Sequence, residues 1–78
     1  MKKVIIFTTE SCPWCKKVKA WYKENGVKYT EKDVGKDAKF GEEAVKKSGQ
    51  TGVPVSVIGD KVIVGFDEAK LKKALGIK

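Results

Sequence analysis

The sequence predicts an α/β domain in which a four-stranded mixed sheet carries helices on both faces. Residues 4–47 alternate short β-prone runs with longer amphipathic runs, a pattern typical of strand–helix–strand units. Residues 53–64 contain two further β-prone runs separated only by Gly59-Asp60, which indicates a hairpin. A last amphipathic run follows. The predicted order is therefore β-α-β-α-β-β-α in one domain, residues 1–78.

The first strand is predicted over residues 4–7, a continuous apolar run of the kind that is buried on both faces of a sheet. A polar loop follows, and a helix begins near Pro13, because the missing N–H of proline costs nothing in a first helical turn. Asn25-Gly26 ends this helix. Its apolar stripe consists of Val18, Trp21 and Tyr22.

The second strand is predicted over residues 27–34, where apolar and polar positions alternate before Gly35. Asp37 can cap a second helix that runs to about Lys47 and stops at Ser48-Gly49. The third and fourth strands are residues 53–58 and 61–64, and Asp67 caps the last helix. The expected buried side chains are Ala38, Phe40, Ala44 and Val45 in the second helix and Leu71, Ala74 and Leu75 in the last.

The two cysteines of the chain, Cys12 and Cys15, lie one helical turn apart at the first strand-to-helix junction. At a helix start, unpaired N–H groups and the positive end of the helix dipole favour a thiolate, and Lys16 and Lys17 add positive potential. Such surroundings lower a thiol pKa from about 8.5 to roughly 3.5–7.5. Cys12 is therefore the predicted nucleophile, and Cys15, deeper in the helix, attacks the mixed disulfide that Cys12 forms.

Other uses of the cysteine pair stay open at this point. A structural disulfide would close a loop of only two intervening residues and would constrain the unfolded chain little. A zinc or iron–sulfur site needs about four ligands, so the two thiols of one chain would need a second chain or outside thiols. We therefore expect no metal within one chain. The absence of histidine excludes a Cys–His acyl-transfer mechanism. The third alternative is a protein that only binds other proteins and whose thiols are incidental.

Val53-Pro54 is the second informative pair of residues. Proline cannot donate a hydrogen bond to a sheet, so a proline at the start of a β run needs a reason. A cis peptide bond before Pro54 would expose the backbone of Val53 beside the thiols, where a substrate strand could pair with it. A trans proline that starts an edge strand is the alternative. Trp14, between the two cysteines, is predicted to be an exposed contact surface.

The charge pattern limits the partners of this protein. The chain has 17 lysines, no arginine, no histidine and 10 acids, which gives a formal net charge of +7. The lysines alternate with acids along the helical runs, so we expect solvated helix faces that attract acidic proteins, and no nucleic-acid surface. No run is long enough to span a bilayer, and no leader segment is recognisable. We expect a monomer in the reducing cytoplasm, away from membranes.

Cys12-Pro13-Trp14-Cys15, residues 48–54 and Gly65-Phe66-Asp67 together resemble a glutaredoxin of the thioredoxin superfamily, over essentially the whole chain. The resemblance implies a thioredoxin-like fold, a thiol–disulfide oxidoreductase and no tightly bound cofactor. It also implies that Cys12 is the nucleophile, Cys15 the resolving thiol and Pro54 the cis-proline. The implied groove for a glutathionyl or protein disulfide is formed by Pro13, Trp14, Gln50, Val53, Pro54 and Gly65.

The resemblance departs from the usual pattern where glutaredoxins hold glutathione. This chain has Thr9 in place of a lysine, Gly52 in place of a threonine, and Ala69 in place of an acid. Gly65-Phe66 is more similar to the NrdH-redoxins, which take electrons from thioredoxin reductase. Both glutathione, as a co-substrate, and a flavoprotein reductase therefore remain candidate electron donors. A dimeric iron–sulfur cluster carrier is the alternative function, and Pro13 speaks against it.

Overall fold

Strands and helices follow each other in the predicted order β-α-β-α-β-β-α. The computed structural model describes residues 3–50 and 52–77. The elements are β1 (Val4–Thr8), α1 (Pro13–Glu24), β2 (Thr30–Asp33), α2 (Ala38–Ser48), β3 (Val55–Ile58), β4 (Lys61–Val64) and α3 (Glu68–Leu75). No helix among the described residues is long and apolar enough to cross a membrane.

The four strands form one mixed sheet in the order β2-β1-β3-β4, as predicted. Strand β1 pairs in parallel with β2 and antiparallel with β3, and β3 and β4 form the antiparallel hairpin. Phe7 lies opposite Val55 and Val55 lies opposite Val64, so the three side chains share one face of the sheet. The parallel pair brings the ends of β1 and β2 to the same edge, where the loop with the cysteines begins.

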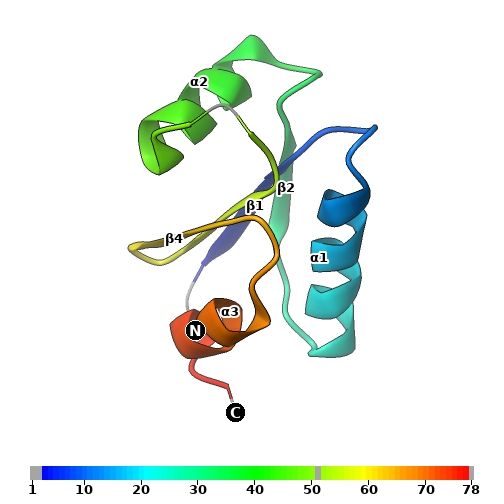
Figure 1. Cartoon of the computed structure of the whole chain (residues 1–78), viewed down its shortest axis with the longest axis vertical. Coiled ribbons are helices and arrows are strands. Elements are labelled where there is room, and N and C mark those ends of the chain that lie inside the picture. The colour runs from blue at the N-terminus through cyan, green and yellow to red at the C-terminus, as the bar shows by residue number, and fades with distance from the viewer. Residues whose placement is uncertain (1–2, 51, 78) are drawn as a thin grey trace.

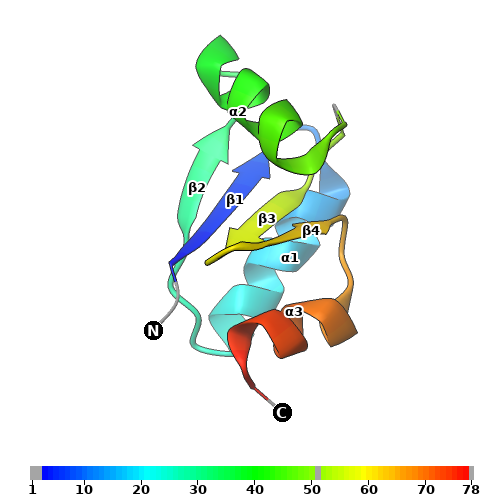
Figure 2. The ribbon, with the colours of Figure 1, turned by 90° about the vertical axis from the view of Figure 1, so that its left-hand side faces the viewer.

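Helices cover both faces of the sheet, but unequally (Figures 1 and 2). Helices α1 and α3 cover one face, and in Figure 2 they lie behind and below the sheet, while α2 crosses its upper end on the near side. The α1/α3 face holds the larger core: Val4, Ile6, Val18, Trp21, Tyr22, Ile58, Ile63, Leu71 and Ala74. The α2 face holds the smaller one: Phe7, Ala44, Val55 and Val57. Most of the buried apolar surface therefore stabilises α1, the helix that carries the cysteines.

The predicted helix ends are confirmed. Asp37 and Asp67 cap α2 and α3 by accepting hydrogen bonds from the backbone N–H groups of Lys39 and Lys70. Gly49 ends α2 in the left-handed conformation, with a φ of 76°, which a side chain would disfavour. Local sequence rules were sufficient at these positions because a cap depends on only a few neighbouring residues.

Two strands start later than predicted. The second strand covers residues 30–33 and not 27–34, because the N–H of Val27 donates to the carbonyl of Tyr22 and so extends the end of α1. The third strand starts at Val55 and not at residue 53, since Pro54 has no N–H to donate to a neighbouring strand. Strand pairing, which sequence alone does not reveal, decides both boundaries.

The predicted buried side of α2 was also partly wrong. Ala44 is buried and Phe40 partly so, but Ala38 and Val45 are exposed. Glu43 of α2 pairs with Lys32 of β2 at 2.8 Å beside this contact, while Phe40 and Ala44, one turn apart, pack in the core between α2 and the sheet. Val45, a further 100° around the helix, therefore points away.

Candidate active site

Cys12 occupies the N-cap position of α1, at the end of the loop that follows β1. Its φ of −95° and ψ of 106° are extended, and its Sγ accepts a hydrogen bond from the backbone N–H of Cys15 at 3.1 Å. Pro13 is the first helical residue, as predicted. The sulfur of Cys12 thus lies where the first turn presents free N–H donors, which stabilise a negative charge on sulfur.

The two cysteines form a disulfide, and their Cα atoms are 5.3 Å apart. Cys12 is partly exposed, whereas Cys15 is only 1% exposed. An incoming substrate can therefore reach the sulfur of Cys12 and not that of Cys15. This difference matches the predicted order, in which Cys12 attacks first and Cys15 attacks second.

The Val53–Pro54 segment lies beside Cys12, as expected. The peptide bond between the two residues is cis, and the carbonyl oxygen of Val53 is 3.9 Å from the Sγ of Cys12. The carbonyl of Pro54 accepts a hydrogen bond from the N–H of Gly65 at 2.8 Å. Three of the predicted groove residues therefore meet at one edge of the disulfide. We call this edge, formed by Val53, Pro54 and Gly65, the backbone rim.

Gln50 lies on the loop that leads to the backbone rim. Its side chain is exposed, and a Cβ built on Gly52 would be 3.6 Å from the amide nitrogen of Gln50. The side chain therefore lies along the loop, next to Gly52. Its predicted contact with a substrate stays a prediction.

Trp14 and Phe66 form a second edge of the site. Trp14 is 54% exposed, as predicted, and its ring centroid is 6.5 Å from that of Phe66. Phe66 was missing from the predicted site residues, because no local pattern places the β4–α3 loop beside the first turn of α1. Its position directly after Gly65 was the available signal. We call Trp14 and Phe66 the aromatic rim.

The two lysines expected to favour the thiolate point to different places. The ammonium of Lys17 lies 4.4 Å from the ring centroid of Trp14, a cation–π contact. Lys16 lines a cleft of about 490 Å³ between α1 and β2, together with Thr9, Lys19 and Glu31. Their effect on the thiol of Cys12 stays a prediction.

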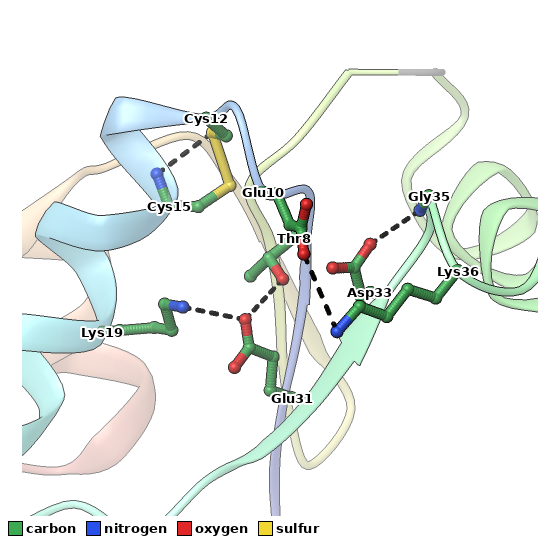
Figure 3. A network of polar contacts seen from close by, with 9 residues as sticks. All are labelled: Thr8, Glu10, Cys12, Cys15, Lys19, Glu31, Asp33, Gly35 and Lys36. Atoms are coloured by element: carbon green, nitrogen blue, oxygen red, sulfur yellow. Dashed lines mark hydrogen bonds and ion pairs between the residues drawn. A yellow bond between two sulfur atoms is a disulfide. The ribbon is translucent and has the colours of Figure 1, made fainter.

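A network of polar side chains lies below the cysteine pair in the view of Figure 3. The hydroxyl of Thr8, which is fully buried at the end of β1, donates to Glu31 of β2 at 2.6 Å. The same carboxylate oxygen accepts from Lys19 of α1 at 2.9 Å. The hydrogen bonds from Lys19 and Thr8 lower the pKa of Glu31. This network joins β1, β2 and α1 and was not predicted from the sequence.

Comparisons with known proteins agree with this geometry. Residues 4–63 match the family model described as Glutaredoxin. An uncharacterized glutaredoxin-like 8.6 kDa protein in the rubredoxin operon of Clostridium pasteurianum is 40% identical over 70 residues, which cover 90% of this chain and 93% of the relative. Glutaredoxin 3 of Escherichia coli K12 is 37% identical over 76 residues, which cover 97% and 92%.

The fold is shared with solved glutaredoxin structures. The crystal structure of the glutaredoxin from Archaeoglobus fulgidus superposes with a TM-score of 0.87 at 32% identity, and the match covers 96% of this chain and 87% of that one. The family match covers β1 to β3, most of β4, the Cys12–Cys15 pair and Val53-Pro54 of the backbone rim. The chain therefore belongs to the glutaredoxin family, the thiol–disulfide oxidoreductases with a thioredoxin-like fold.

Proposed function

We propose that this protein reduces disulfide-containing proteins and glutathionyl substrates in the cytoplasm through a Cys12–Cys15 dithiol cycle. One observation carries the proposal: one sulfur of the pair is reachable and accepts a backbone N–H, while the other is buried. A reachable thiolate is a nucleophile, and a buried thiol one turn away is suited to attack the resulting mixed disulfide and displace the substrate sulfur from it.

The cycle begins with the reduced pair. The thiolate of Cys12 attacks one sulfur of the substrate disulfide, forms a mixed disulfide and releases the other substrate sulfur as a thiolate. Cys15 then gives its proton to solvent and attacks the Sγ of Cys12. This step forms the Cys12–Cys15 disulfide and releases the second substrate thiolate. The substrate gains the two electrons that the dithiol loses.

Backbone pairing supports the positioning of a polypeptide substrate. The carbonyl of Val53 lies 3.9 Å from the reactive sulfur and points toward it. A substrate chain bonded to Cys12 would run past this carbonyl, and pairing with the backbone rim would hold it in an extended conformation. Gln50 lies along the same loop and would flank the chain.

We further propose that a flavoprotein of the thioredoxin-reductase type supplies the electrons in preference to glutathione. Thr9 and Ala69 have no charge with which to hold the two ends of glutathione. Phe66 places an aromatic ring beside Trp14, at the edge where the family resemblance expects the γ-glutamyl end. A hydrogen bond to a charged group is worth about 1.5–3 kcal/mol, so losing one predicts a rate with glutathione lower by about tenfold or more.

A coupled assay tests the electron donor. NADPH oxidation is followed with one disulfide substrate, once with thioredoxin reductase and once with glutathione plus glutathione reductase. We expect the faster rate with thioredoxin reductase. The double variant Thr9→Lys, Ala69→Asp should raise the glutathione-coupled rate and leave the other rate within about twofold, since neither side chain belongs to the cysteine pair or to either rim. A faster wild-type rate with glutathione would overturn the proposed donor, and no turnover with either donor would overturn the proposed cycle.

A further inference from the structure

The aromatic rim exposes apolar surface at the first turn of α1, the helix that Cys12 caps. Trp14 lies in the first turn of α1, directly before Cys15 and two residues after Cys12, and it is the most exposed large apolar side chain that the structure describes. Phe66 reaches it from the β4–α3 loop, with an angle of 47° between the two rings. Exposed aromatic rings that contact each other next to a reactive group are typical of a binding surface.

Neighbouring contacts hold both rings in place. Lys17 contacts the Trp14 ring, and Phe66 packs on its inner side against the core between the sheet, α1 and α3. Phe66 also follows Gly65, whose N–H donates to the carbonyl of Pro54. The aromatic rim is therefore attached to the backbone rim. Rings that are already ordered lose little conformational entropy when a ligand binds.

The two rims offer different chemistry to a substrate. The backbone rim presents the carbonyl of Val53 to the substrate backbone, whereas the aromatic rim presents two ring faces and edges. A substrate sulfur bonded to Cys12 would bring the residues next to its cysteine past Val53 and the first turn of α1, and so toward both rims. An apolar side chain there would bury its surface against the rings, while a polar one would lose water without gaining a hydrogen bond.

We propose that Trp14 and Phe66 form a subsite for an apolar side chain adjacent to the reacting cysteine of a polypeptide disulfide. This inference rests on the dithiol cycle proposed above and names the class of substrate within it. Glutathione has no apolar side chain next to its cysteine, so the subsite favours protein disulfides over glutathionyl groups on small molecules. Phe66 is the specificity-determining residue, because its ring contacts Trp14 and completes the apolar surface of the subsite.

Synthetic peptides test the subsite. Each peptide contains one cysteine as a mixed disulfide with 2-mercaptoethanol. Two pairs of peptides are compared, and within a pair one peptide has leucine and the other asparagine next to that cysteine. The varied residue precedes the cysteine in the first pair and follows it in the second. Rate constants are measured with the fully reduced protein in single turnovers. We expect leucine to be preferred by about tenfold in at least one pair, the lower end of the range for discrimination by an apolar pocket.

Variants test whether the aromatic rim causes the preference for leucine. Phe66→Ser should reduce the preference to less than about threefold, whereas Phe66→Leu, which keeps an apolar wall and the core contact, should retain most of it. Val62→Ser is the matched control, because Val62 is an exposed apolar residue of β4 outside either rim. The ratio of the rate constants for two peptides, both measured on one protein sample, does not depend on the fraction of the protein that is folded.

The outcomes separate this subsite from the proposed cycle. Equal rates for leucine and asparagine in both pairs, or an unchanged preference in Phe66→Ser, would overturn the subsite and leave the cycle intact. Failure of the wild-type protein to react with any of the peptides would instead overturn the dithiol cycle.

Discussion

Cys12 and Cys15 are one helical turn apart, yet their surroundings differ in almost every respect. Cys12 is partly exposed, caps α1 and accepts an N–H from the helix, and two rims flank it. Cys15 is buried above the network of Thr8, Glu31 and Lys19 (Figure 3). Identical side chains thus differ in exposure and hydrogen bonding through position alone, because a helix start exposes its first residue and packs the next turn against the sheet.

The largest expected effect comes from removing each sulfur in turn. Cys12→Ser should lower disulfide turnover by about 1,000-fold or more, since the attacking sulfur is lost. Cys15→Ser should still attack but stop at the mixed disulfide, which intact-mass spectrometry detects as an adduct of one substrate thiol. Full turnover in Cys12→Ser, or an adduct on Cys15 in that variant, would reverse the assigned roles.

The next largest expected effect is a difference in the rate of alkylation between the two sulfurs of the reduced wild-type protein. Helix-start thiols are largely ionised near neutral pH, whereas ordinary thiols are ionised by only a few per cent, so we expect iodoacetamide to modify Cys12 about 30-fold faster than Cys15 or more. Peptide mapping of samples quenched at short times measures both rates. Equal labelling would contradict the contrast between the two environments.

A smaller effect concerns the core behind α1. The hydroxyl of Tyr22 donates to that of Ser56 at 2.6 Å, and both residues are fully buried. Tyr22→Phe removes the donor and should destabilise the protein by about 1–3 kcal/mol in denaturant unfolding. Tyr29→Phe is the control, because the Tyr29 ring packs on Tyr22 near the surface, and it should cost less than about 0.5 kcal/mol. A larger loss in the control would contradict the role of the buried pair.

The smallest effect concerns the network behind Cys15 and depends on pH. Glu31 is partly exposed, so after solvent screening we expect Glu31→Gln to cost less than about 1 kcal/mol at pH 7. Because folding lowers the pKa of Glu31, the contribution of its carboxylate to the free energy of unfolding is complete above the ordinary pKa of 4.5. This contribution is lost as the pH falls through the folded-state pKa.

Unfolding free energies measured from pH 7 downward check this prediction. Wild type and Glu31→Gln should converge as the solution is acidified. Glu43→Gln, which removes the ion pair with Lys32 on the opposite face of the sheet, provides the matched control. A difference between wild type and Glu31→Gln that stays constant down to low pH would show that the carboxylate charge is not responsible.

Local sequence rules predicted much of the fold and the chemistry. Periodicity and caps located all seven elements, and Asp37, Gly49 and Asp67 end helices as expected. The same rules failed where pairing or packing decides. Strand β2 is shorter than its alternating pattern, and Val45 is exposed because Phe40 and Ala44 occupy the side of α2 that packs on the sheet.

The sequence by itself predicted the cysteine pair and its place at a helix start, and from these the order of attack that we propose. These depend on residues within one or two helical turns of each other, where backbone geometry leaves few alternatives. Only the tertiary structure decided what surrounds Cys12 and Cys15. The sheet order β2-β1-β3-β4 brings Val53 and Phe66 to one end of α1 and Glu31 beneath it. Contacts over such separations depend on how whole elements pack, which no local pattern encodes.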